Sequence, residues 1–206
     1  MSVKTDGKKE IFPKERSKSR QLLEKCASGK NFEVYKKQEG LYQAKIYNEQ
    51  INYFVEVKKG FRPYNNQLRR MKQVREGFDF VGYENIAGDY KVRFSEDLSC
   101  GIIYAIKKGK YVVKLLIDNA CLCKAKIEGK NNVQQLLYQD FIKGVDLEYV
   151  IGAGILKENI IVKEKGTGKE FAFILKTQNL DMQLSQDGKV LNFLEKNGEE
   201  VSLPHD

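Results

Sequence analysis

Residues 101–117 read GIIYAIKKGKYVVKLLI, and this stretch decides the fold class. Two runs rich in β-branched and aromatic residues, 102–106 and 111–117, lie on either side of Lys108-Gly109-Lys110, which has the composition of a tight turn. Short apolar runs bounded by turn residues are typical of strands that face a core. The stretch therefore predicts two strands joined by a turn.

The same pattern continues outward in both directions. Towards the N-terminus, residues 41–47 and 51–57 alternate with a period of two and predict a hairpin. Further strands are expected at 90–94, 145–151, 155–163, 170–176, 180–186 and 190–194. About twelve short strands at this spacing predict an all-β fold with two packed, mostly antiparallel sheets in a sandwich-like arrangement.

Two boundaries divide the chain. Residues 1–30 are polar and basic and predict an arm or a short helix, while residues 31–206 predict one β-rich domain. Gly129-Lys130-Asn131-Asn132 interrupts the strand pattern, so two sub-sheets are expected to meet near 129–133. The stretches that compete as helices are Gln21–Ala27, Gln67–Arg75 and Val133–Tyr138.

Charge is distributed unevenly along the 206 residues. Residues 1–75 hold 19 Lys and Arg against 8 Asp and Glu, a net +11, whereas residues 76–206 hold 17 against 20, a net −3. Such asymmetry indicates either a basic face for nucleic acid, an anionic cell-wall polymer or an acidic protein, or a solvated face that keeps the chain soluble. Aromatic residues interleave with the basic ones between Tyr35 and Tyr64, as in surfaces that stack bases of single-stranded nucleic acid.

The predicted contact residues for such a partner lie near an asparagine-rich turn, where binding residues are often exposed. They are Arg62, Tyr64, Arg69 and Arg70.

Residues for metal or nucleophilic chemistry are scarce. Cys121 and Cys123 form a C-x-C pair, and a metal site would need Cys26, Cys100 or His205 to join them. Reduced thiols in a core are the simpler interpretation. His205 is the single histidine of the chain, so a catalytic triad is not expected. No phosphate-binding or dinucleotide-binding loop is present, and no cofactor is expected.

One carboxylate pair is a candidate for hydrolytic chemistry. Asp146 and Glu148 would share a strand face at a separation that suits acid–base work on a glycosidic bond. The alternative is a solvent-facing strand rim, with Val145, Leu147 and Tyr149 pointing inward. Nearby, Lys157-Glu158 predicts a cross-strand salt bridge at a sheet margin.

Several segments in order resemble one bacterial module, the N-terminal β-rich domain of RHS or YD-repeat proteins, which include wall-associated proteins and polymorphic toxins. The most specific segments are Tyr138–Phe141, Val145–Tyr149, Leu156–Val162, Asp187-Gly188 and Asn197–Val201, with weaker ones at Lys30–Phe32, Gly40–Ala44, Ile51–Tyr53, Gly60-Phe61 and Tyr64–Leu68. The chain departs from the family at Asn52, where His is usual, and at Phe61, where Trp is usual.

The resemblance implies a non-enzymatic structural or adhesion module whose partner is the remainder of a larger protein or an anionic surface polymer. It implies an extracellular or cell-wall location. The first twenty residues do not form a secretory signal, so a cytoplasmic location stays open. The family continues with more strands where this chain reaches Leu203–Asp206, so either a fragment or a truncated gene product is expected.

Two functional alternatives remain beside the adhesion module, namely a basic binding module for nucleic acid or an anionic polymer, and a hydrolase using Asp146 and Glu148. Asn197-Gly198 also predicts a hairpin between residues 190–194 and 201–203. Its outer edge is expected to be unpaired and to mediate self-association. No run of about 18 apolar residues is present, so no membrane-spanning helix is expected.

Overall fold

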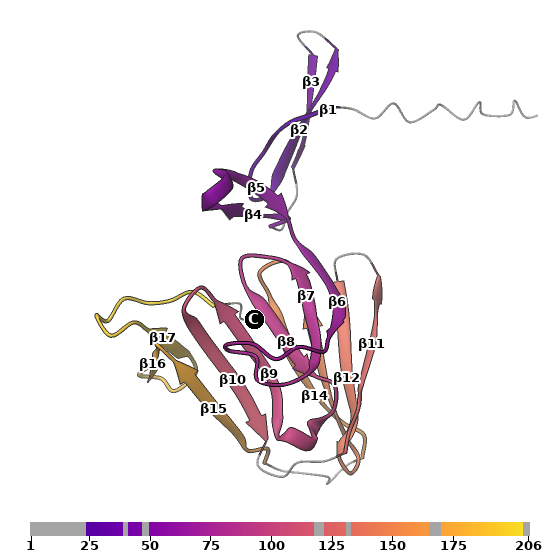
Figure 1. Cartoon of the computed structure of the whole chain (residues 1–206), viewed down its shortest axis with the longest axis vertical. Helices are drawn as coiled ribbons and strands as arrows, with labels where there is room; N and C mark the ends of the chain where they lie inside the picture. The colour runs from indigo at the N-terminus through magenta and orange to yellow at the C-terminus, as the bar shows by residue number, and fades with distance from the viewer. Residues whose placement is uncertain are drawn as a thin grey trace, which may run out of the picture.

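β-Strands dominate the computed structural model, which describes residues 24–38, 41–46, 50–117, 122–130, 133–164 and 170–203. Within these ranges the strands form sheets of six and four strands and three smaller sheets, and the ladders are antiparallel (Figure 1). Helical structure in the described part is limited to the 3-10 turns η1 (Glu56–Lys58) and η2 (Leu98–Cys100). The predicted all-β fold of packed antiparallel sheets is confirmed.

The six-stranded sheet has the order β15-β10-β9-β8-β7-β6. Its central hairpin is the stretch that decided the fold class, with Tyr111 paired to Lys108 across a turn in which Gly109 has φ 57°. A glycine adopts this left-handed conformation without strain. The strands are β6 (Asn65–Met71), β7 (Gly82–Ala87), β8 (Lys91–Ser95), β9 (Ile102–Lys108), β10 (Tyr111–Ile117) and β15 (Phe173–Gln178).

The four-stranded sheet follows chain order and consists of β11 (Ala125–Lys130), β12 (Val133–Ile142), β13 (Val145–Ile151) and β14 (Leu156–Val162). The prediction that two sub-sheets meet near 129–133 is wrong. Gly129 pairs with Gln134 inside the β11–β12 hairpin, and the chain changes sheet between Ile117 and Ala125. Turn residues mark a reversal of the chain, but they do not say whether the next strand joins the same sheet.

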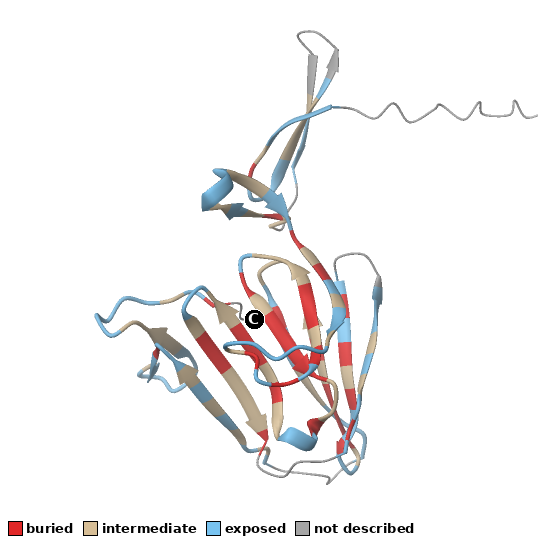
Figure 2. Cartoon of the chain, viewed as in Figure 1, coloured by how far each residue is buried: buried red, intermediate tan, exposed pale blue. Residues whose placement is uncertain are grey.

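The core lies between these two sheets. Phe94 on β8 and Tyr104 on β9 contact the ring of Tyr149 on β13, with centroid distances of 5.2 and 5.3 Å. The hydroxyl of Tyr138 on β12 donates to the Ser95 carbonyl oxygen at 2.7 Å. Figure 2 shows the buried positions concentrated on the strands of the two sheets. Hydrogen bonding and aromatic packing therefore fix one sheet against the other.

A second, slender part projects from one end of the sandwich (Figure 1). Its strands are β1 (Glu24–Ser28), β2 (Phe32–Gln38) and β3 (Leu41–Ile46), which form one sheet, and β4 (Asn52–Val55) and β5 (Gly60–Pro63), which form another. We call residues 24–63 the β extension and residues 64–203 the sandwich body. The expected β-rich domain of residues 31–206 therefore includes most of the β extension and the whole sandwich body.

All three competing helical interpretations are wrong where the structure describes them. Residues 24–28 form β1 and pair with β2, residues 65–71 form β6, and residues 133–142 form β12. The arm of residues 1–23 lies outside the described residues. Each stretch finds a complementary neighbouring strand, and this pairing overrides a weak local preference for helix.

The hairpin predicted from 41–47 and 51–57 is also wrong. β3 pairs backward with β2, whereas β4 pairs forward with β5. η1 lies between β4 and β5, and Lys59 follows it with φ 41°. Each run contains a strand, β3 or β4, as its alternation predicts, but the second strand ends at Val55 and the two have different partners.

The C-terminal segment returns to the sandwich. β16 (Asp181–Leu184) pairs with β17 (Leu191–Leu194), and the Val201 amide then donates to the Phe193 carbonyl oxygen at 2.8 Å. Leu203 is only 7% exposed and belongs to the core. The predicted return of residues 201–203 alongside residues 190–194 is therefore present, but the expectation that Leu203 contributes no core packing is wrong.

Candidate functional site

A buried ion-pair network organises the outer face of the six-stranded sheet, which is the face away from the sandwich core. Glu84 on β7 and Arg93 on β8 are opposite one another and are 2% and 0% exposed. The Arg93 guanidinium donates to Glu84 Oε2 at 3.0 and 2.8 Å, and Arg75 donates to Glu84 Oε1 at 2.6 Å. One carboxylate therefore holds two guanidinium groups.

The segment after β6 covers this network. Arg93 Nη1 donates to the carbonyl oxygens of Gln73 and Phe80 at 3.0 Å each, which holds the segment against the sheet. The ring of Phe78 is fully buried and lies 4.7 Å from the Arg93 guanidinium and 5.2 Å from that of Arg75. Burial of the network, hydrogen bonds and cation–π contacts thus hold the Arg75 guanidinium in a fixed position.

Beside Arg75 the surface is hollowed to a volume of about 470 Å³. Lys91 and Lys107 supply two further cationic groups there. Lys91 Nζ donates to the carbonyl oxygens of Asn85, at 2.8 Å, and Ile86. The complete lining is Arg75, Glu76, Phe78, Gly88, Asp89, Tyr90, Lys91, Lys107 and Gly109.

Positive charge is in excess around this hollow. Burial lowers the pKa of Lys91, and the nearby charges of Arg69 and Arg75 lower it further, while Glu84 acts in the opposite direction. Five cationic side chains therefore lie around three carboxylates, and these five belong to Arg69, Arg75, Lys91, Arg93 and Lys107. Those carboxylates are engaged, because Glu84 holds two arginines, Glu76 is 3.4 Å from Lys107, and Asp89 accepts from a tyrosine.

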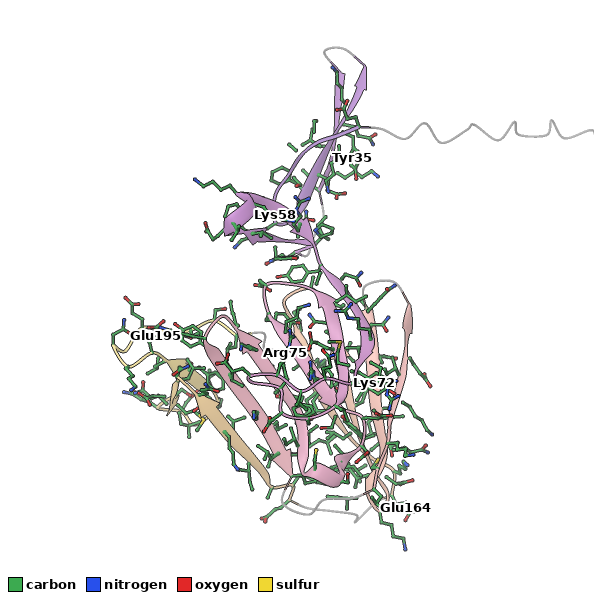
Figure 3. The ribbon with its side chains drawn as sticks, viewed as in Figure 1. Tyr35, Lys58, Lys72, Arg75, Glu164 and Glu195 are labelled. Atoms are coloured by element: carbon green, nitrogen blue, oxygen red, sulfur yellow. The ribbon has the colours of Figure 1, made fainter. Side chains whose placement is uncertain are left out.

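We call Arg69, Arg75, Lys91 and Lys107 the basic cluster. Figure 3 shows Arg75 in front of the six-stranded sheet, apart from Lys58 on the β extension. The cluster is assembled from β6, the segment after it, β8 and β9, so it exists only in the folded chain.

The four residues predicted to contact a partner lie in different parts of the structure. Arg69 belongs to the basic cluster, and Arg62 is exposed on β5 of the β extension. Arg70 forms an ion pair with Glu96 at 2.7 Å. Tyr64 is 2% exposed and donates its hydroxyl to Asp89 at 2.8 Å, so it supports the wall of the hollow and presents no surface to a partner.

Sequence reasoning missed Glu84, Arg93, Lys91 and Lys107. Alternation places Val92 and Phe94 inward and Arg93 outward, which suggests a solvated arginine. The available signal was Phe78-Asp79-Phe80, because two phenylalanines in a turn-rich segment need a surface to cover.

The carboxylate pair considered for hydrolysis is engaged in structural contacts. Val145, Leu147 and Tyr149 are fully buried, as predicted. Asp146, however, is 8% exposed and not a solvent-facing rim. Its Oδ1 lies 2.6 Å from Lys163 Nζ and accepts from the Asp140 amide at 2.7 Å. Glu148 accepts from Asn159 at 2.7 Å.

The described residues contain no group of three or more His, Cys, Asp or Glu side chains placed to hold a metal ion. Cys26 and Cys100 are exposed free thiols, and the Sγ of the buried Cys123 donates to the Gln139 carbonyl oxygen at 2.9 Å. Cys121 and His205 lie outside the described residues.

No family model, curated protein or solved structure matches this chain. Within the described ranges, no helix has the length and apolar character needed to cross a membrane. The basic cluster is the surface feature that best supports a functional proposal, because it combines a hollow, an excess of positive charge and side chains that are held in place.

Proposed function

We propose that the chain is a non-enzymatic adhesion module that binds an anionic polymer through the basic cluster. The observation that carries this proposal is the gathering of five cations around three engaged carboxylates beside a hollow of about 470 Å³. The resemblance to RHS or YD-repeat modules implies the same adhesion role. It also implies a second partner, which is the remainder of a larger protein.

Preorganisation favours binding at this place. The Arg93–Glu84 pair fixes the position of Arg75, whose side chain is still 50% exposed and can donate to a ligand. Guanidinium and ammonium groups form short, charge-assisted hydrogen bonds with phosphate, sulfate and carboxylate oxygens. Because the cations are already placed, less conformational entropy is lost on binding.

A flexible polymer recognised by its charge fits better than nucleic acid recognised by its bases. Phe78 and Tyr90, the aromatic residues of the hollow, are 0% and 2% exposed and offer no face for stacking. In the β extension, Tyr35 donates to Glu33 and Phe54 packs against Phe61 at 5.3 Å. Stacking on free aromatic rings is the main means of binding single-stranded nucleic acid, and the hollow presents no such ring.

The test measures binding to fluorescently labelled inorganic polyphosphate at several salt concentrations. Wild-type chain is expected to bind at low salt and to lose affinity linearly with the logarithm of salt concentration, because counterions are released. Arg69→Gln with Lys107→Gln is expected to weaken binding about tenfold and to reduce the magnitude of the salt slope by about two.

The matched control is Lys176→Gln with Lys196→Gln, which removes the same charge from exposed positions elsewhere on the sandwich body. Equal losses in the two double variants would contradict a localised site. A clear preference for single-stranded DNA over polyphosphate of equal charge would favour the nucleic-acid module instead.

A further inference from the structure

One position on the core-facing side of β14 carries a charge, Glu158, and this residue is exposed where the sheet edge opens to solvent. Leu156, Glu158 and Ile160 alternate along β14, and the two apolar members pack against the core. Glu158 is directly opposite Tyr149 in the strand register, and Tyr149 is fully buried. Lys157-Glu158 was expected to form a cross-strand salt bridge at a sheet margin, and the cross-strand partner that the structure shows for Glu158 is the hydroxyl of Tyr149.

Glu158 lies in the wall of a cavity of about 530 Å³ between the two sheets. Tyr104, Ile106, Val113 and Leu175 from the six-stranded sheet and Leu156 from the four-stranded sheet form its interior, and the C-terminal segment forms its mouth. Cavities of this size accommodate small organic ligands.

The cavity exists because edge strands β14 and β15 are not paired with each other. Their inner side chains leave a space, which β17 and residues 200–203 cover in part. Leu203 anchors that cover in the core. The cavity is therefore located where the edges of the two sheets meet.

The polar groups of the cavity define the chemistry of its ligand. The Tyr149 hydroxyl donates to Glu158 Oε2 at 2.5 Å, and within the described residues Oε1 accepts no hydrogen bond. At the mouth, Lys189 and Glu200 balance one another in charge. The cavity lining thus presents one carboxylate, exposed to solvent and with one oxygen that accepts no hydrogen bond from the described residues, beside an apolar surface.

We propose that this cavity binds a small amphiphile with an aliphatic body and a primary amine that donates to Glu158. The aliphatic body contacts the apolar walls from both sheets, and the ammonium group neutralises the carboxylate. Burial of the Glu158 carboxylate raises its pKa, while the hydrogen bond from Tyr149 acts in the opposite direction. A bound ammonium group would remove the energetic cost of keeping that carboxylate charged.

The experiment titrates the full chain with n-octylamine, n-octanol and n-octanoate by calorimetry, below their micellar concentrations. We expect the amine to bind at least about tenfold more tightly than octanoate. Glu158→Gln is expected to lower the amine affinity about tenfold and to change the octanol affinity less than about twofold. Glu148→Gln is the matched control, because Glu148 lies on the other face of the same sheet and bonds to Asn159.

Two further measurements locate the site. Methyl NMR signals of Leu156, Leu175 and Leu203 are expected to shift with the amine, and Leu175→Trp, which fills the cavity, is expected to abolish binding of all three ligands. Equal affinity for amine and octanoate, or an unchanged amine affinity in folded Glu158→Gln, would overturn the proposal. If Glu158→Gln does not fold, the Tyr149→Phe and Leu175→Trp variants decide. An amine affinity that is unchanged in both of these variants would also overturn the proposal.

Discussion

Arg93 is the most confined charged side chain of the protein. It is fully buried, donates to Glu84 and to two carbonyl oxygens, and lies against the ring of Phe78. A buried guanidinium is stable only when its donors are satisfied, since desolvation of a charge costs several kcal/mol. The contacts of Arg93 therefore hold β7, β8 and the segment after β6 together.

Replacing Arg93 is expected to destabilise the fold strongly. Arg93→Met removes the partner of a buried carboxylate and is expected to lower the free energy of unfolding by about 3–5 kcal/mol, measured by urea denaturation. Lys176→Met, at an exposed position, is expected to change it by less than about 0.5 kcal/mol. A loss below about 1 kcal/mol in Arg93→Met would show that Arg75 alone satisfies Glu84.

At this scale, alternation correctly predicted the buried faces at Val145, Leu147 and Tyr149. It did not reveal Arg93 or Glu158 as inward or covered charges. Alternation tells which side of a strand a residue occupies, but not what covers that side. Arg93 is buried because a loop packs on the outer face, and Glu158 lines a cavity although it is exposed, because its strand is the edge of the four-stranded sheet.

At the scale of elements, the strands were predictable and their partners were not. Residues 41–46 and 52–55 are strands, yet they belong to different sheets. Residues 47–49 lie outside the described residues, and the chain beyond them begins a new pairing at Asn52. The Asn52 side chain donates to the Gly29 carbonyl oxygen at 2.8 Å, a contact between segments that local sequence does not encode.

The C-terminal segment is expected to stabilise the sandwich through Leu203. Leu203→Ala is expected to lower the free energy of unfolding by about 2–3 kcal/mol, because a buried side chain is lost next to an existing cavity. Leu184→Ala, which is 60% exposed on β16, is the control and is expected to change it by less than about 0.5 kcal/mol. Equal effects in thermal denaturation would mean that residue 203 does not anchor the segment.

At the scale of the whole molecule, the two parts differ in how much of their surface they bury. Of the described residues in the β extension, Gly29 and Asn52 are buried, while Ile46 and Val57 are 78% and 95% exposed. Sheets of two or three strands without a core are marginally stable. The sandwich body holds the hydrophobic core.

Amide hydrogen exchange on the full chain is therefore expected to separate the two parts. Amides of Val34 and Tyr35 in β2 are expected to exchange at least about a hundredfold faster than those of Ile103 and Ala105 in β9, since local opening of β2 exposes little apolar surface. Similar protection in both parts would show that the β extension and the sandwich body unfold as one unit.

The path of the backbone from β5 into β6 has a mechanical consequence. Tension applied to the β extension enters the sandwich body at β6, which lies at the edge of its sheet and pairs with β7. The Arg70–Glu96 pair reaches past β7 to the residue after β8, and the Arg75–Glu84 pair reaches β7 itself. The first pair therefore fastens the loaded strand beyond its own neighbour, and the second holds the segment that follows β6, so both oppose separation of β6 from the sheet.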